Sequence, residues 1–160
     1  MLRARRIVAA GAWPLAERRG TLTLTYEDRH RRRRNFATDT GESVVLDLPQ
    51  ATMLRHGDAL ALDDGGFVAI SAAPEELIEI AAEPELLTRL AWHLGNRHLA
   101  VEFRDGRIIA RDDHVIAAML EGLGAGVRRF RGPFNPEGGA YAREGVSSHT
   151  HDPRHDHDSH

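Results

Sequence analysis

The chain has 160 residues, of which 41% are hydrophobic and 28% charged, so it can form one or two small folded domains. It contains no cysteine, which excludes disulfides, thiolate metal sites and cysteine nucleophiles, so any metal must be bound through nitrogen and oxygen. The net charge of −3 gives no overall attraction to nucleic acid.

The first segment of the chain, residues 1–16, is basic and then mildly apolar, as a signal peptide is. Its apolar part is short and is interrupted by Pro14, so we interpret it as a first β-strand. No apolar run in the chain approaches the ~18 residues that a transmembrane helix needs. We therefore expect a cytoplasmic protein without a membrane partner.

Short segments with frequent turns predict β-structure up to about residue 73. Residues 21–25 alternate between threonine and leucine, as a half-buried strand does, and residues 43–48 form another strand that is expected to end at Pro49. Residues 59–62 and 67–70 flank two aspartates and two glycines, which predicts a hairpin. A run of arginines from Arg29 to Arg34 is placed between two strands, as a solvated hairpin end or a docking surface for an acidic partner.

The pattern changes near Pro74. Residues 77–81 form a short apolar strand, and a helix is expected from Pro84 to Gly95 because its leucines recur at helical spacing. Two strands, 99–103 and 107–111, are joined by Asp105 and Gly106 in a hairpin turn.

A second helix follows, capped by Asp112 or Asp113. The last strand of this half covers residues 127–130, which completes the order β-α-β-β-α-β of a ferredoxin-like unit.

These elements predict an α+β protein with an all-β small barrel or sandwich over residues 1–73 and a ferredoxin-like domain over residues 74–142. Residues 143–160 are expected to form a disordered tail, because glycine, serine, histidine and aspartate cannot bury a core.

Half of the ten histidines fall in the last twelve residues, interleaved with aspartates: His149, His151, His155, His157 and His160. Imidazole is the commonest transition-metal side-chain ligand, so this tail is interpreted as a metal-binding segment. Incidental polar disorder and a cloning scar are the alternatives.

Three more histidines lie in the α/β half. His93 follows Leu86 by seven residues, close to the apolar face of the first helix, and is expected to be a packed core histidine. His98 lies where that helix gives way to a strand, and His114 lies in the first turn of the second helix. For both, the residues alone favour a purely structural role slightly over metal binding.

The chain carries no nucleophile elbow, phosphate-binding loop or zinc-protease motif, and it has no lysine. We therefore expect no enzymatic activity. A metal-dependent hydrolase built on His98 and His114 is one rival, although a catalytic metal normally has three fixed ligands. RNA binding is another, but Phe103 is the only aromatic residue expected on the two central strands of the ferredoxin-like unit.

Three segments resemble the UreE family of urease accessory nickel metallochaperones. They are Trp-His-Leu-Gly-Asn-Arg-His at residues 92–98, Asp-His-Val-Ile-Ala-Ala-Met-Leu at 113–120, and Pro-Phe-Asn-Pro-Glu-Gly-Gly-Ala-Tyr at 133–141. The resemblance implies a β domain that binds partners and a ferredoxin-like domain that binds metal and forms a homodimer. The implied partners are the urease apoprotein and its accessory GTPase, and the implied metal is Ni²⁺, with Zn²⁺ or Cu²⁺ as competitors in vitro.

By motif position, the resemblance makes His98 the principal nickel ligand, shared between two copies at the dimer interface. His114 corresponds to a secondary ligand, and His149, His151, His155 and His157 supply further ligands. One departure is that Arg111-Asp112 stands where some members have another histidine before the Asp-His pair, so a second internal site is expected to be weak or to use carboxylate oxygen. The alternative function is a His-rich protein that buffers zinc, copper or nickel without a dedicated delivery partner.

Overall fold

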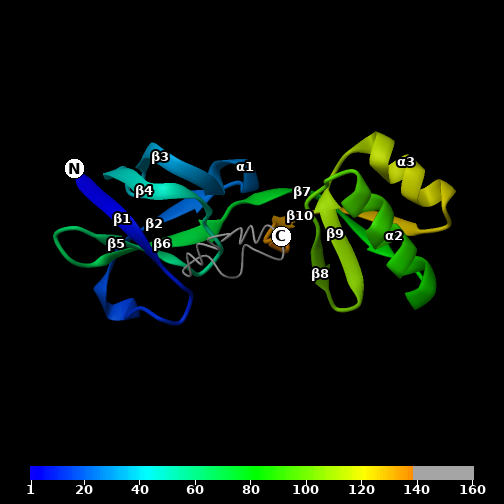
Figure 1. Cartoon of the computed structure of the whole chain (residues 1–160), viewed down its shortest axis with the longest axis horizontal. Coiled ribbons are helices and arrows are strands. Elements are labelled where there is room, and N and C mark those ends of the chain that lie inside the picture. Colours follow the sequence, from blue (N-terminus) through cyan, green and yellow to red (C-terminus); the bar gives the residue numbers. More distant parts are fainter. Residues whose placement is uncertain (139–160) are drawn as a thin grey trace, which may run out of the picture.

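The structure of the protein is a computed structural model that describes residues 1–138. It is a mixed α+β fold with one curled sheet and a second, smaller sheet covered by helices (Figure 1). The predicted tail lies outside the described residues. No helix in residues 1–138 is long and apolar enough to cross a membrane.

The first sheet has six strands in the order β2-β6-β5-β1-β4-β3. Its strands are β1 (Leu2–Val8), β2 (Arg18–Leu24), β3 (His30–Ala37), β4 (Ser43–Met53), β5 (Ala59–Leu62) and β6 (Phe67–Ala72). A 3₁₀ turn, η1 (Leu15–Glu17), precedes β2, and a one-turn helix, α1 (Tyr26–Arg29), precedes β3. The inner face of the curl buries a continuous apolar core that includes Leu22, Val44 and Leu60.

The second sheet has four strands in the order β10-β7-β9-β8. Its elements follow the predicted order: β7 (Pro74–Ala81), α2 (Pro84–Asn96), β8 (Glu102–Arg104), β9 (Arg107–Arg111), α3 (His114–Gly122) and β10 (Gly126–Pro133). Both helices pack on one face, where Leu90 of α2 and Leu120 of α3 are fully buried with Ile78, Ile80 and Ile108.

Both predicted hairpins are confirmed. Asp105 and Gly106 have φ of 52° and 73°, the left-handed pair that a tight two-residue turn requires. The turn between β5 and β6 contains Gly66 at φ 84°, where a Cβ would lie 2.6 Å from Arg19 Cδ. Only glycine fits this close approach without a shift of the arginine.

Several predicted strand limits were wrong, among them those of β4 and β8. Strand β4 continues past Pro49 to Met53. Its pairing with β3 is interrupted between Asp47 and Thr52, so no hydrogen bond of the sheet requires an N–H at Pro49. Strand β8 begins at Glu102 rather than residue 99, because Leu99 N–H is used to close α2.

The arginine run does not lie between two strands. Arg29 ends α1, and the following arginines belong to β3, which is an edge strand of the first sheet. The sequence does not reveal this strand, because it lacks the alternation of buried and exposed residues that marks one: Arg33 and Arg34, at consecutive positions, are both exposed. Arg29, by contrast, is fully buried.

The two sheets meet at a junction built around the segment that follows β10. Phe134 is fully buried there with Leu77 and Ile109, and its ring stands edge-on to Tyr26 of α1 at 5.6 Å. The guanidinium of Arg29 donates to the carbonyl oxygen of Phe134, to Asn135 Oδ1 (3.4 Å) and to Leu54 O (3.5 Å). The segment from which the tail departs is therefore held by the first sheet as well as the second.

Candidate metal centre

His98 lies two residues beyond α2, after the C-cap Arg97, in the left-handed backbone conformation with φ 55°. The N–H of His98 donates to Gly95 O (3.0 Å) and the N–H of Leu99 donates to Leu94 O (3.1 Å). This hydrogen-bond pair is the Schellman closure of a helix, in which the left-handed position is usually glycine. The prediction that Gly95 ends the helix was wrong, since α2 includes Gly95 and closes at His98.

The conformation of His98 has a cost. A side chain in the left-handed region brings Cβ close to the following carbonyl oxygen, at about 1–2 kcal/mol, although histidine tolerates it better than most residues. The side chain is exposed, so no core packing offsets this cost. A strained and exposed histidine is the pattern expected where a ring must be presented at a surface.

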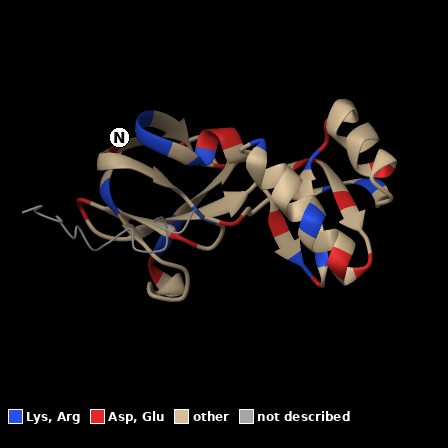
Figure 2. Ribbon diagram, turned by 45° about the vertical axis from the view of Figure 1, so that its right-hand side comes forward, with Lys and Arg blue, Asp and Glu red and all other residues tan. Residues whose placement is uncertain are grey.

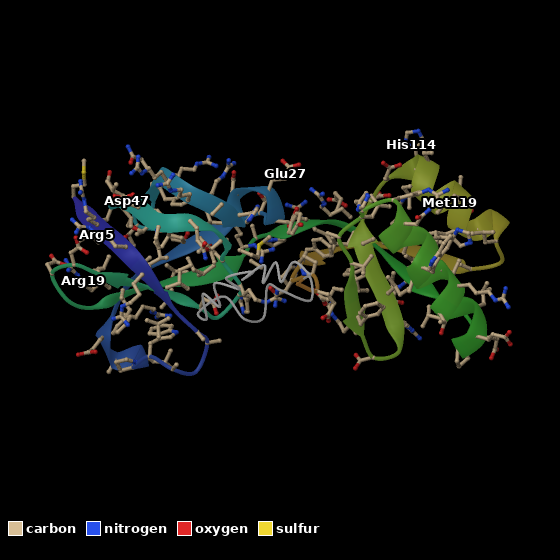
Figure 3. All side chains as sticks on the ribbon, in the orientation of Figure 1. Arg5, Arg19, Glu27, Asp47, His114 and Met119 are labelled. Atoms are coloured by element: carbon tan, nitrogen blue, oxygen red, sulfur yellow. The ribbon has the colours of Figure 1, made fainter. Side chains whose placement is uncertain are left out.

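His114 is the first residue of α3 and is also exposed. Asp113 caps the helix, accepting hydrogen bonds from Val115 N (2.9 Å) and Ile116 N (3.2 Å). The His114 side chain stands at the start of α3 and points away from the sheet (Figure 3). The cap fixes the backbone at this position and leaves the imidazole unobstructed.

Topology brings the backbones of these two histidines to the same end of the second sheet. Strands β7 and β9 are antiparallel, with Arg111 at the end of β9 opposite Leu77 near the start of β7. His114 follows β9 directly, and Asp112 N–H donates to Glu76 O (2.9 Å). Since Glu102 pairs with Ile109, the chain after His98 enters β8 from this same end.

The described part of one copy, residues 1–138, does not assemble a metal site by itself. Within residues 1–138, no group of three or more histidine, aspartate or glutamate side chains is placed to hold a metal ion. His149, His151, His155 and His157 lie outside the described residues. The described part of the chain therefore offers isolated donors, and further ligands must come from elsewhere.

His93 is not a core residue. It is half-buried, and its ring contacts the neighbouring Trp92 ring edge-on at 5.2 Å. The core positions of this helix are taken by Leu90 and Leu94, three residues before and one after it. The prediction of a core position for His93, which rested on its seven-residue spacing from Leu86, was wrong because Leu86 is itself only half-buried.

His56 has a structural role that no pattern in the sequence indicates. Its Nδ1 accepts a hydrogen bond from Ala72 N–H (3.1 Å), which ties the loop after β4 to the end of β6. It lines a cavity of about 400 Å³ at the junction of the two sheets, with Arg55, Glu102, Arg104 and Asn135 among the other walls. Of these, Glu102 is held by an ion pair with Arg104 and by a hydrogen bond from Asn135 N–H (2.7 Å). The polar groups that line this cavity therefore hold the two sheets together.

Apolar side chains are exposed on the helical layer of the second sheet. Trp92 of α2 and Val115 of α3 are each 64% exposed. Phe103 is also exposed, and it lies on the edge strand β8 rather than on a central strand as predicted. The central strands β7 and β9 carry no aromatic residue, so the described sheet has no central stacking platform for bases.

Comparison with known proteins gives matches along the whole chain. The family model described as "UreE urease accessory protein, C-terminal domain" matches residues 75–160, and the model for the N-terminal domain matches residues 3–73. The urease accessory protein UreE of Beijerinckia indica is 47% identical over 94% of this chain and 87% of its own length. Those of Agrobacterium fabrum and Rhodobacter capsulatus are 47% and 41% identical, covering 93% and 98% of this chain and 92% and 97% of their own.

Proposed function

The chain belongs to the UreE family of urease accessory proteins, and on this premise we propose that it binds Ni²⁺ through histidines and delivers it for assembly of the urease active site. An accessory protein of this family is not an enzyme, so His98 and His114 are proposed as carrier ligands rather than catalytic ones. Zn²⁺ and Cu²⁺ are expected to compete in vitro, because nitrogen donors bind copper(II) more tightly than nickel.

The observation that carries the proposal is the exposed, left-handed His98 at the end of α2. One imidazole per copy makes a weak site. Two copies related by a twofold axis bring the same residue together twice, so a homodimer through this domain would create a half-complete coordination shell. The exposed Trp92 and Val115 on the adjacent helices support an interface there, since burial of such side chains favours association.

The remaining ligands are proposed to come from His114 and from His149, His151, His155 and His157 of the tail. Tethered ligands act at high effective concentration, yet each can detach singly. Stepwise replacement of tail imidazoles by ligands of a receiving protein would then allow the ion to leave without passing through a bare state.

The two halves of the chain are proposed to divide the work. Residues 1–73 would form the partner-binding unit, residues 74–142 the metal-binding and dimerising unit, and residues 143–160 the tail. The proposed partners are the urease apoprotein and its accessory GTPase, and the proposed location is the cytoplasm.

The test is calorimetric titration of Ni²⁺ into three proteins at pH 7–8: the intact chain, a version ending at Tyr141, and that version with His98→Ala. We expect the shortened protein to bind about one nickel per dimer and the His98→Ala variant to lose it. If His98→Ala keeps the same stoichiometry and affinity, the shared site is not built on His98. His93→Ala in the shortened protein is the matched control, since it removes a half-buried histidine from the same helix.

The second candidate function, metal buffering by the tail alone, makes the opposite prediction. It requires that the version ending at Tyr141 bind no metal. The absence of a three-ligand group in residues 1–138 of one copy favours this alternative only if the chain is monomeric. The oligomeric state must therefore be measured in the same samples.

A further inference from the structure

Arginines from two strands flank the outer face of β4. Arg3 of β1 pairs in register with Val45 of β4, and Arg33 of β3 pairs with Asp47 on the other side. Figure 2 shows the β3 arginines as a blue stretch that follows the red, acidic helix α1. Arginine side chains therefore border β4 from both neighbours, at the part of the first sheet that is far from His114 (Figure 3).

These arginines line a shallow groove of about 420 Å³. Its walls are Arg3, Arg33, Arg34, Asn35, Val45, Leu46 and Asp47. Three arginines stand against one aspartate in this lining, and Arg34 also pairs with Asp28 at 2.5 Å, so the lining together with that partner has a net charge of +1. The hydrogen bond from Arg33 to Asp47 (2.8 Å) holds the pKa of that carboxyl below its ordinary value, and the positive charges of Arg3 and Arg5 lower it further.

Prevention of pairing between sheet edges explains only some of the arginines in this groove. Charged side chains on an edge strand prevent pairing with other chains, and this accounts for the arginines of β3. Strand β1, however, is an interior strand that pairs with both β4 and β5, so Arg3 has no edge to protect. Arg5 has its own partner, Asp63 at 3.4 Å, whereas no carboxylate within 4.0 Å of Arg3 is found in residues 1–138.

We propose that this groove holds the chain's own Asp- and His-rich segment, residues 149–158, when that segment carries no metal. The proposal rests on the function proposed above, in which the segment also supplies metal ligands. With neutral imidazoles the segment has a net charge of −2, from Asp152, Asp156 and Asp158 against Arg154. Aspartates at this spacing can each pair with a separate guanidinium, and arginine binds carboxylates in a bidentate fashion.

The length of the chain permits this contact. The last described residues are held at the junction, where Glu137 N–H donates to Val101 O (2.7 Å). From there to Asp152 an extended chain of about fifteen residues spans up to roughly 50 Å. A compact unit of about seventy residues is roughly 30 Å across, so the segment can reach the groove of its own copy. Tethering raises its effective concentration to the millimolar range, where weak ion pairs suffice for docking.

Metal binding should release the segment. A divalent ion held by the imidazoles cancels the charge of −2, and the attraction to the arginines is lost with it. By thermodynamic linkage, docking then weakens metal binding by the same factor as metal weakens docking. The groove would thus hold the metal-free segment away from His98 and His114 and release it when the segment binds an ion.

The experiment uses the full chain, which has no cysteine, so that Ser159→Cys accepts a single nitroxide spin label. We expect paramagnetic broadening of the amide signals of Asn35, Val45 and Asp47 at about 20 mM salt, and its loss at about 0.5 M salt, where exposed charges are screened. The variant R3Q/R33Q should lose the broadening. The control Arg19→Gln, which removes an exposed arginine of the same sheet outside the groove, should keep it.

Three outcomes would overturn the proposal. The first is the absence of broadening at the groove amides, or broadening there that is unchanged in R3Q/R33Q. The second is broadening of equal strength in a mixture of labelled unenriched and unlabelled ¹⁵N-enriched copies, which would assign the contact to a second copy. The third is broadening that persists after addition of Zn²⁺, a diamagnetic ion of the same charge as Ni²⁺.

A calorimetric titration separates this proposal from the proposed function. R3Q/R33Q should bind Zn²⁺ at least about twofold more tightly than the parent chain, because a segment docked half of the time is available half of the time. Failure of docking leaves the effect of His98→Ala on nickel binding in place. Failure of the His98 site leaves the broadening at the groove in place.

Discussion

The N–H of Leu99 donates to the carbonyl of Leu94 at 3.1 Å and closes helix α2 with His98 held between them at φ 55°. Any residue with a Cβ is strained at this position, whereas glycine adopts the same conformation without strain. The fold alone would therefore favour glycine here, and the imidazole is kept at a cost in stability.

This relationship gives a prediction that separates folding from metal binding. We expect His98→Gly to be more stable than His98→Ala by about 1 kcal/mol, because only alanine keeps the left-handed strain. When made in the version that ends at Tyr141, both substitutions should abolish nickel binding to the same extent. Urea unfolding followed by circular dichroism measures the first quantity, and a His98→Ala variant as stable as His98→Gly would show that the position is not strained.

Capping of α3 by Asp113 supports a second prediction. Asp113→Ala removes the acceptor for Val115 N and Ile116 N, and we expect a loss of about 1 kcal/mol in the free energy of unfolding. Asp113→Asn should retain most of this stability, because asparagine is an equally good cap. As a control, Asp64→Ala removes only an exposed ion pair with Arg19 and should change stability by less than about 0.5 kcal/mol. Equal losses in all three variants would rule out a capping role.

The junction between the sheets gives a third prediction. Arg29→Met removes the donor that satisfies Phe134 O, Asn135 Oδ1 and Leu54 O, and we expect a loss of about 2–4 kcal/mol in the free energy of unfolding. Arg33→Met, at an exposed ion pair, is the matched control. A change below about 0.5 kcal/mol for Arg29→Met in urea unfolding would show that these contacts do not hold the junction.

A fourth prediction concerns acid. Glu79 accepts hydrogen bonds from Arg128 (3.1 Å) and Arg107 (2.7 Å), which hold the pKa of its carboxyl below its ordinary value of 4.5. A carboxyl whose pKa is lower in the folded state stabilises the fold above its unfolded pKa, and this contribution is lost as the pH falls through the folded pKa.

We therefore expect Glu79→Gln to be less stable than the parent at pH 6 and the difference to shrink below pH 4.5. Urea unfolding at intervals between pH 3 and 6 measures this. Glu85→Gln, at an exposed pair with Arg89, should give a parallel curve to the parent throughout. If the Glu79→Gln difference is independent of pH, the carboxylate charge is not what stabilises this face of the sheet.

Much of the fold could be predicted, because strands and helices in this chain follow local patterns. The leucine spacing of α2, the Asp105-Gly106 turn and the Asp113 cap each depend on neighbours within a few residues. The β-α-β-β-α-β order followed from these signals alone. The strands that were misplaced, β3 and the second half of β4, carry charge or proline where a strand pattern predicts neither.

The candidate site was less accessible to sequence reasoning. Local chemistry pointed to Gly95 as the end of α2, and only the pairing of Leu94 with Leu99 places His98 in the left-handed position instead. The buried state of Arg29 depends on Phe134 and Asn135, more than a hundred residues away. No pattern in a single sequence indicates contacts of this range.

The contact between Arg29 and Phe134 also sets an order of events during synthesis. Domains form from the N-terminus as the chain emerges, so the strands of the first sheet are available early. Arg29, however, must wait for a partner 105 residues later in the chain. The junction therefore closes only on a nearly finished polypeptide, and a chain that ends before Phe134 would leave the Arg29 guanidinium, Leu77 and Ile109 without the residue that covers them.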